Sequence, residues 1–113
     1  MIVNTPPYGD ERIWNALRLA KALVAVAAVL KINVFLLGDA VSAAKKGQKT
    51  PEGFYNLEKM LSELIGRGAV INACGTCINS RGIAESELVD GVKVGTMISL
   101  SKWVQESQKV LTF

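Results

Sequence analysis

The feature that most restricts the fold is a six-residue run, 32–37, in which β-prone apolar residues follow one another almost without interruption. Such a run is typical of a strand that is covered on both faces, and strands of that kind belong to parallel sheets. The run ends at Gly38-Asp39, which indicates a turn. Segments with apolar residues at helical spacing lie on both sides of it. The pattern therefore predicts a parallel sheet whose strands alternate with helices.

The rest of the chain repeats this alternation. Strands are expected at 1–3, 32–37, 69–73, around Val92 and Val94, and at 110–113, and helices are expected after Asp10, over 54–65 and over 97–104. The fold class is therefore α/β: a three-layer α/β/α sandwich with a mostly parallel sheet of about five strands. Since 113 residues, half of them apolar, suffice for one core, we expect a single domain over 1–113.

The expected helix after Asp10, its predicted N-cap, carries two apolar stripes. One stripe should pack on the sheet and consists of Ile13, Leu17, Ala20, Val24, Ala27 and Ala28. The other consists of Leu19, Val26, Val29 and Leu30, and a small monomer would leave it in water. We interpret this second stripe as a subunit interface, and burial by neighbouring loops is the alternative.

Charge and hydropathy argue against several partners. The thirteen Lys and Arg residues are interleaved with ten Asp and Glu, so the net charge of +3 does not indicate a nucleic-acid binder. The longest apolar run, 22–30, is shorter than the roughly 20 residues of a membrane span, and since no basic segment precedes an apolar one at the start, we expect no secretory signal. We expect a soluble, cytoplasmic protein. Three lysines, 45, 46 and 49, lie in an expected mobile loop, 42–53, and one hypothesis is that they steer an acidic partner.

The chemistry points to the two cysteines, Cys74 and Cys77, which follow the predicted strand 69–73. A reducing compartment disfavours a structural disulfide. The chain has no histidine, which excludes a Cys-His hydrolase and leaves too few soft ligands for structural zinc, so we expect no metal and no cofactor. Backbone N–H groups at a strand-to-helix junction, with Arg81 nearby, would favour an exposed thiolate at Cys74. Such a thiolate attacks sulfur without a general base.

Because the carboxyl ends of parallel strands meet at one edge of a sheet, the turns that follow them should build one site. We predict Cys74 and Cys77 as its catalytic residues, although Cys77 could simply face the core. The residues expected to line the site are Asn4, Thr5, Tyr8, Gly38, Asp39, Gly75, Thr76, Arg81 and Thr96.

Several segments resemble the DsrE/DsrF-like family, and together they cover essentially the whole chain. They are 4–12, 16–20, 35–40, 72–77 with its Cys-Gly-Thr-Cys, 80–83 and 110–113. The resemblance implies a DsrE-like, flavodoxin-like topology and a homo-oligomer, commonly a trimer or hexamer. In the DsrE and TusD sulfur carriers one cysteine after the third strand takes up sulfane sulfur as a persulfide, and Cys74 matches it. The pair itself is typical of the small YchN-like branch.

Three functions follow as hypotheses. The first is a sulfur-relay protein that carries a persulfide on Cys74 and works with sulfur-donor and sulfur-acceptor proteins; as an enzyme it would be a sulfurtransferase component. The second is an oligomeric binding or assembly module without catalysis, as in the YchN-like type. The third is a Cys-x-x-Cys dithiol oxidoreductase, which the position of the motif after two strands and two helices disfavours.

Overall fold

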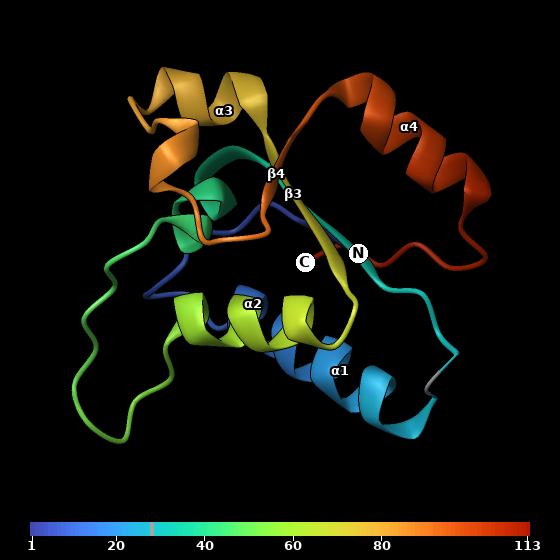
Figure 1. Ribbon diagram of the computed structural model, residues 1–113, viewed down its shortest axis with the longest axis horizontal. Helices are drawn as coiled ribbons and strands as arrows, with labels where there is room; N and C mark the ends of the chain where they lie inside the picture. Colours follow the sequence, from blue (N-terminus) through green and yellow to red (C-terminus); the bar gives the residue numbers. More distant parts are fainter. Residues whose placement is uncertain (28) are drawn as a thin grey trace.

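The computed structural model describes residues 1–27 and 29–113 and shows a parallel sheet between helices (Figure 1). The strands are β1 (Ile2–Val3), β2 (Asn33–Leu36), β3 (Val70–Cys74) and β4 (Lys93–Gly95), and they lie side by side in chain order. The helices are α1 (Arg12–Val26), α2 (Leu57–Gly66), α3 (Gly75–Ser80) and α4 (Met97–Glu106), with 3-10 segments η1 (Gly38–Ala44) and η2 (Glu85–Glu87). In Figure 1, α1 and α2 cover one face and α4 the other.

The predicted α/β class with a parallel sheet is confirmed, but the sheet has four strands instead of about five. Residues 110–113 form only a single parallel bridge, Thr112 opposite Ile2, because β1 offers just two residues to pair with. The order also differs from the flavodoxin-like one, in which the first strand lies between the second and the third. Here β2 pairs directly with β3, in the register Val34 to Ile71.

Both faces of the central strands are buried, which explains the continuous apolar run at 32–37. Val34 and Leu36 are fully buried, and Phe35 between them is 1% exposed. Side chains alternate along a strand, so Phe35 points to the opposite face, where its ring meets Trp103 of α4 edge-on at 5.8 Å. A Cβ on the neighbouring Gly95 would lie 2.6 Å from this ring, so the ring occupies the space that a side chain would need.

Helix α1 differs from its prediction at both ends. Its N-cap is Glu11, and Asp10 instead accepts the backbone N–H of Arg12 through Oδ1 at 2.9 Å. It ends at Val26 because the chain must turn back to reach β2, so Val29 lies outside the helix, and the predicted stripe member Ala28 lies outside the described residues. Of the sheet-facing stripe, Ile13, Leu17 and Ala20 are buried as expected, whereas Val24 and Ala27 are only half-buried.

The second apolar stripe of this region is exposed. Val26 is 82% exposed and Val29 98%, while Leu19 and Leu30 are about two-fifths exposed at 38% and 43%. Neighbouring loops therefore do not bury it, and that alternative is wrong. Among the described residues, no helix is long and apolar enough to cross a membrane.

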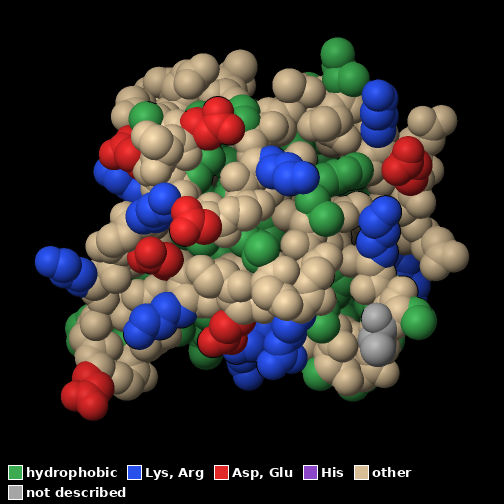
Figure 2. All heavy atoms as spheres, in the orientation of Figure 1, with side chains coloured by type: hydrophobic (Ala, Val, Ile, Leu, Met, Phe, Trp, Pro, Cys, Tyr) green, Lys and Arg blue, Asp and Glu red, His purple; other side chains and the backbone are tan. Residues whose placement is uncertain are grey.

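The segment expected to be a mobile loop, 42–53, is partly built into the fold. Its first residues belong to η1, and Gln48 donates through Nε2 to the carbonyls of Ala43 and Lys45 at 2.7 and 2.9 Å. Lys45 pairs with Glu87 at 3.7 Å, and Lys46 pairs with Asp90 at 2.9 Å. Figure 2 shows acidic and basic side chains interspersed over one face of the molecule. Because two of the three clustered lysines already have acidic partners, the structure gives the steering hypothesis little support.

Candidate functional site

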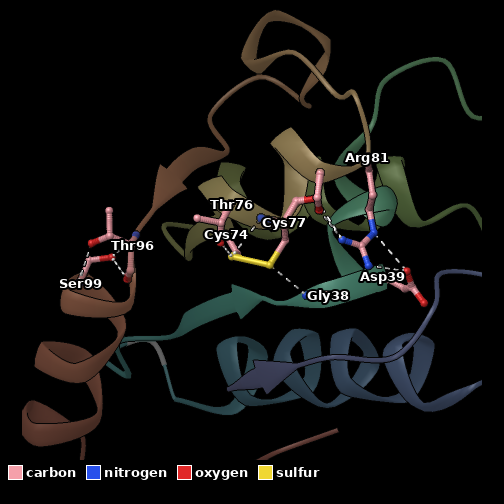
Figure 3. The surroundings of a disulfide bond; sticks show 9 residues. Gly38, Asp39, Cys74, Thr76, Cys77, Arg81, Thr96 and Ser99 are labelled. Carbon is pink, nitrogen blue, oxygen red and sulfur yellow. Dashed lines mark hydrogen bonds and ion pairs between the residues drawn. A yellow bond between two sulfur atoms is a disulfide. The ribbon is translucent and has the colours of Figure 1, made fainter.

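The cysteine pair lies where β3 passes into α3. Cys74 is the last residue of β3 and the N-cap of α3, and Cys77 lies in the first turn of that helix. Residues three apart on a helix share a face, and the two Cα atoms are 5.2 Å apart. The two sulfurs form a disulfide, as Figure 3 shows, so the expectation of two free thiols is wrong for the form described here.

The two cysteine residues differ in their exposure to solvent. Cys74 is only 7% exposed, contrary to the expectation of an open thiol, because it ends a central strand that has β2 on one side and β4 on the other. Cys77 is half-buried. Cys77 is therefore the more exposed residue of the pair.

Hydrogen-bond donors surround both sulfurs. The backbone N–H of Cys77 donates to Sγ of Cys74 at 3.3 Å, and the hydroxyl of Thr76 lies 3.3 Å from the same sulfur. The backbone N–H of Gly38 donates to Sγ of Cys77, also at 3.3 Å. Gly38 adopts a φ of 55°, a conformation that favours glycine and that presents its N–H to α3. Donors in these positions stabilise negative charge on sulfur.

Arg81 has a different role from the one predicted. Its guanidinium donates to Oδ1 of Asp39 through Nε and Nη2, at 3.1 and 2.7 Å, and to the carbonyl of Cys77 through Nη1 at 3.1 Å. Its charge is thus neutralised by Asp39 instead of facing Cys74, so its expected effect on the Cys74 thiolate is not supported. The contacts join the turn after β2 to the end of α3 (Figure 3).

The structure brings together six of the predicted residues and separates others. The group around the disulfide comprises Gly38, Asp39, Cys74, Thr76, Cys77 and Arg81. Gly75 packs beside it, since a Cβ there would lie 3.0 Å from Cγ1 of Val94. Thr96 caps α4 in a reciprocal pair with Ser99, away from the disulfide in Figure 3.

The predicted residues of the first turn serve other contacts. The backbone N–H of Asn4 donates to the carbonyl of Phe113 at 2.9 Å. Tyr8 packs against the segment 48–57. Its hydroxyl contacts Gln48 and accepts the N–H of Leu57 at 3.2 Å, and its ring stacks on that of Tyr55. Thr5 is buried, and within the described residues its hydroxyl oxygen has no hydrogen-bond partner.

One buried polar residue near the cysteines escaped the sequence reasoning. Asn72 is 8% exposed, and its Oδ1 has no hydrogen-bond partner among the described residues. Side chains alternate along β3, so Asn72 points to the same face as Cys74. An amide in the middle of an otherwise apolar strand is the signal that could have revealed it. Among the described residues, no group of three or more His, Cys, Asp or Glu side chains is placed to hold a metal ion.

This combination of parallel sheet and cysteine turn defines a class of proteins. The chain matches the DsrE/DsrF-like family over residues 1–113 and belongs to that family. Protein YchN of Escherichia coli K12 is 42% identical over 113 residues, which are all of this chain and 96% of that protein. An uncharacterized protein of Methanocaldococcus jannaschii is 41% identical, with the same coverage.

Solved structures agree with this assignment. The crystal structure of the YchN protein from E. coli superposes with a TM-score of 0.93 at 44% identity, over 99% of this chain and 96% of that one. A protein of unknown function from Methanobacterium thermoautotrophicum superposes with a TM-score of 0.77 at 16% identity, over 99% and 96% of the two chains. This second likeness shows the shared fold alone.

Proposed function

We propose that this protein is a sulfur-relay protein that takes up sulfane sulfur as a persulfide on Cys74 and passes it to an acceptor protein. Family membership suggests a sulfur-relay role. The observation that carries the proposal is the pair of donors on one sulfur: the N–H of Cys77 and the hydroxyl of Thr76, each 3.3 Å from Sγ of Cys74. They stabilise the anionic sulfur that the transfer needs at its start and at its end.

The transfer consists of two attacks on sulfur. In the reduced protein, the Cys74 thiolate attacks the outer sulfur of a donor persulfide, and the donor leaves as a thiolate. An acceptor thiolate then attacks the outer sulfur on Cys74, whose own thiolate leaves. Alternatively, Cys77 attacks the inner sulfur, expels hydrosulfide and forms the disulfide between the two residues. The observed pairing supports this second branch, since both sulfurs lie within bonding reach.

The relay requires reducing surroundings and partners. We propose the cytoplasm as its compartment, because thiols there would keep the pair reduced. The partners are a sulfur-donor protein, a sulfur-acceptor protein and further copies of this chain. The exposed apolar side chains of Leu19, Val26, Val29 and Leu30 support a homo-oligomer, and the family resemblance implies a trimer or hexamer.

A mass measurement tests the relay. The reduced protein is incubated with thiosulfate or with a desulfurase-loaded donor, and its intact mass is measured. We expect a gain of about 32 Da, one sulfur atom, in Cys77→Ser but not in Cys74→Ser; in the wild type, Cys77 can expel this sulfur, so the product is either the adduct or the disulfide with released hydrosulfide. A Cys77→Ser variant without the adduct, or a Cys74→Ser variant that keeps it, would contradict the proposal.

The disulfide itself favours a second candidate function, that of a dithiol oxidoreductase. In that case the protein exchanges its disulfide with those of other proteins, without carrying sulfur. Turbidimetric reduction of insulin by the reduced protein tests it, and the activity should require both Cys74 and Cys77. If neither the sulfur adduct nor insulin reduction is observed, an assembly module without catalysis becomes the better description.

A further inference from the structure

We infer that Cys77 is the sulfur at which a thiol from outside opens the disulfide, so that Cys74 becomes available only after a partner has engaged Cys77. The inference deepens the proposed function and rests on it, because it describes how the relay cysteine is released. Its basis is the difference between the surroundings of the two sulfurs.

The first part of the argument is access. An attacking thiolate has to reach one sulfur of the pair along the line of the S–S bond. Cys74 is 7% exposed at the end of a central strand, whereas Cys77 is half-buried on the first turn of α3. An approach from solvent therefore meets Cys77 first.

The second part is the fate of the sulfur that leaves. Attack on Cys77 expels Cys74 as a thiolate, and exchange is faster when the leaving thiolate is stabilised. Two donors already lie against this sulfur, the N–H of Cys77 and the hydroxyl of Thr76. Attack in the opposite sense would expel Cys77, to whose sulfur the described residues supply one donor, the N–H of Gly38. Both access and leaving-group stabilisation thus favour the same direction.

The balance of the step is simple. The outside thiolate forms a disulfide with Sγ of Cys77, the Cys74–Cys77 bond breaks, and its electron pair stays on Sγ of Cys74. No net oxidation or reduction occurs until a second outside thiolate resolves the mixed disulfide and frees Cys77 as a thiolate. The released Cys74 thiolate is the group that takes up sulfane sulfur in the relay. The disulfide therefore keeps Cys74 from reacting until an outside thiol has opened it.

Trapping in the wild-type protein tests the direction. The oxidised protein is mixed with glutathione and quenched early with N-ethylmaleimide, and the tryptic peptide 68–81, which holds both cysteines, is sequenced by mass spectrometry. We expect glutathione on Cys77 and maleimide on Cys74, with about a tenfold excess over the reverse arrangement. Equal amounts, or glutathione mainly on Cys74, would overturn the inference.

A second measurement does not depend on trapping. In the reduced single variants, at a pH high enough to ionise both thiols so that only access differs, Cys74→Ser should react with an aromatic disulfide reagent about tenfold faster than Cys77→Ser, and unfolding in denaturant should remove the difference. Equal rates in the folded state would also overturn the inference. Neither readout involves sulfur loading, so its failure is distinguishable from failure of the relay: glutathione on Cys77 without any 32-Da adduct contradicts only the relay.

Discussion

Arg81 donates two hydrogen bonds to the same carboxylate oxygen of Asp39, Oδ1: one from Nε at 3.1 Å and one from Nη2 at 2.7 Å. The residues are 42 positions apart in the sequence, one after β2 and the other after α3. The same guanidinium also holds the carbonyl of Cys77. Gly38 precedes Asp39 and donates its N–H to Sγ of Cys77. The Arg81–Asp39 ion pair therefore holds the N–H of Gly38 against this sulfur.

Replacing Arg81 should loosen this contact at little cost to overall stability. For Arg81→Ala we expect the free energy of unfolding to fall by about 1 kcal/mol or less, because the pair is partly exposed. The amide of Gly38 should exchange its hydrogen about tenfold faster, as measured by NMR. Arg12→Ala is the matched control, since it breaks another exposed Arg-Asp pair, with Asp10, and should leave Gly38 unchanged. Unchanged exchange at Gly38 in Arg81→Ala would contradict the positioning role.

Asp10 should contribute a pH-dependent part of the stability. The side-chain hydrogen bond from Arg12, followed by the bond from its backbone N–H, lowers the pKa of Asp10 to about 2. A lowered folded-state pKa means that the contribution is complete above the unfolded value of about 3.9 and is lost as pH falls through the folded value. Asp10→Asn should therefore lower the Tm at pH 6, and its difference from the wild type should shrink between about pH 4 and 2. A difference that stays constant over this range would refute the assignment.

Gly95 is predicted to tolerate no side chain. In Gly95→Ala the new Cβ would meet Cε2 of Phe35 at 2.6 Å and Cβ of Asn72 at 3.1 Å, so we expect a loss of about 1–3 kcal/mol from overpacking. Chemical denaturation measures the loss, and adding Phe35→Leu should recover part of it. Gly66→Ala is the control, because a Cβ on that helical glycine would have nothing within 4 Å, and it should be neutral or slightly stabilising. A neutral Gly95→Ala would show that the ring can move aside.

Gln48 should hold the 45–56 segment in place. Besides its bonds to Ala43 and Lys45, its backbone N–H donates to Oε2 of Glu58 at 2.8 Å, and its carbonyl accepts from Asn56 at 3.1 Å. Gln48→Ala removes the side-chain bonds, and we expect a loss of about 1–2 kcal/mol and faster tryptic cleavage after the nearby lysines. Glu52→Ala, an exposed position in the same segment, is the comparison and should be cleaved at the wild-type rate. Equal cleavage of both variants would argue against this role of Gln48.

The exposed apolar stripe leads to a prediction about assembly. We expect sedimentation equilibrium to give the mass of a trimer or hexamer for the wild type, and a smaller species for Val26→Asp, which places a charge on a side chain that is 82% exposed. The control is Ala25→Ser at the neighbouring exposed position, which adds no charge and should leave the mass unchanged. A monomeric wild-type protein would contradict the interpretation of the exposed apolar stripe as a subunit interface.

The sequence was most informative where a single local pattern decides the structure. The apolar run at 32–37 became a buried strand because both of its faces are covered, and the strand stops just before Gly38-Asp39 as expected, although these two residues begin the 3-10 segment η1 instead of a simple turn. The position of Cys74 at the junction of a strand and a helix followed from the same reasoning.

Long-range contacts could not be predicted in this way. The burial of Cys74 depends on strands on both sides of β3, and the partner of Arg81 comes from a distant turn. α1 ends at Val26, where the chain turns back toward β2, although its apolar spacing continues further. The disulfide, likewise, depends on how closely α3 follows β3.

The bridge between Thr112 and Ile2 has a consequence for how the protein is handled. Leu111 and Phe113 cover the outer side of β1 through backbone bonds of 2.7 and 2.9 Å to Ile2. Trimming residues 110–113, or fusing a bulky tag there that pulls them away, would bare the unpaired amides and carbonyls of this border strand. Unpaired edge strands pair with strands of other molecules, so such preparations should be prone to aggregation.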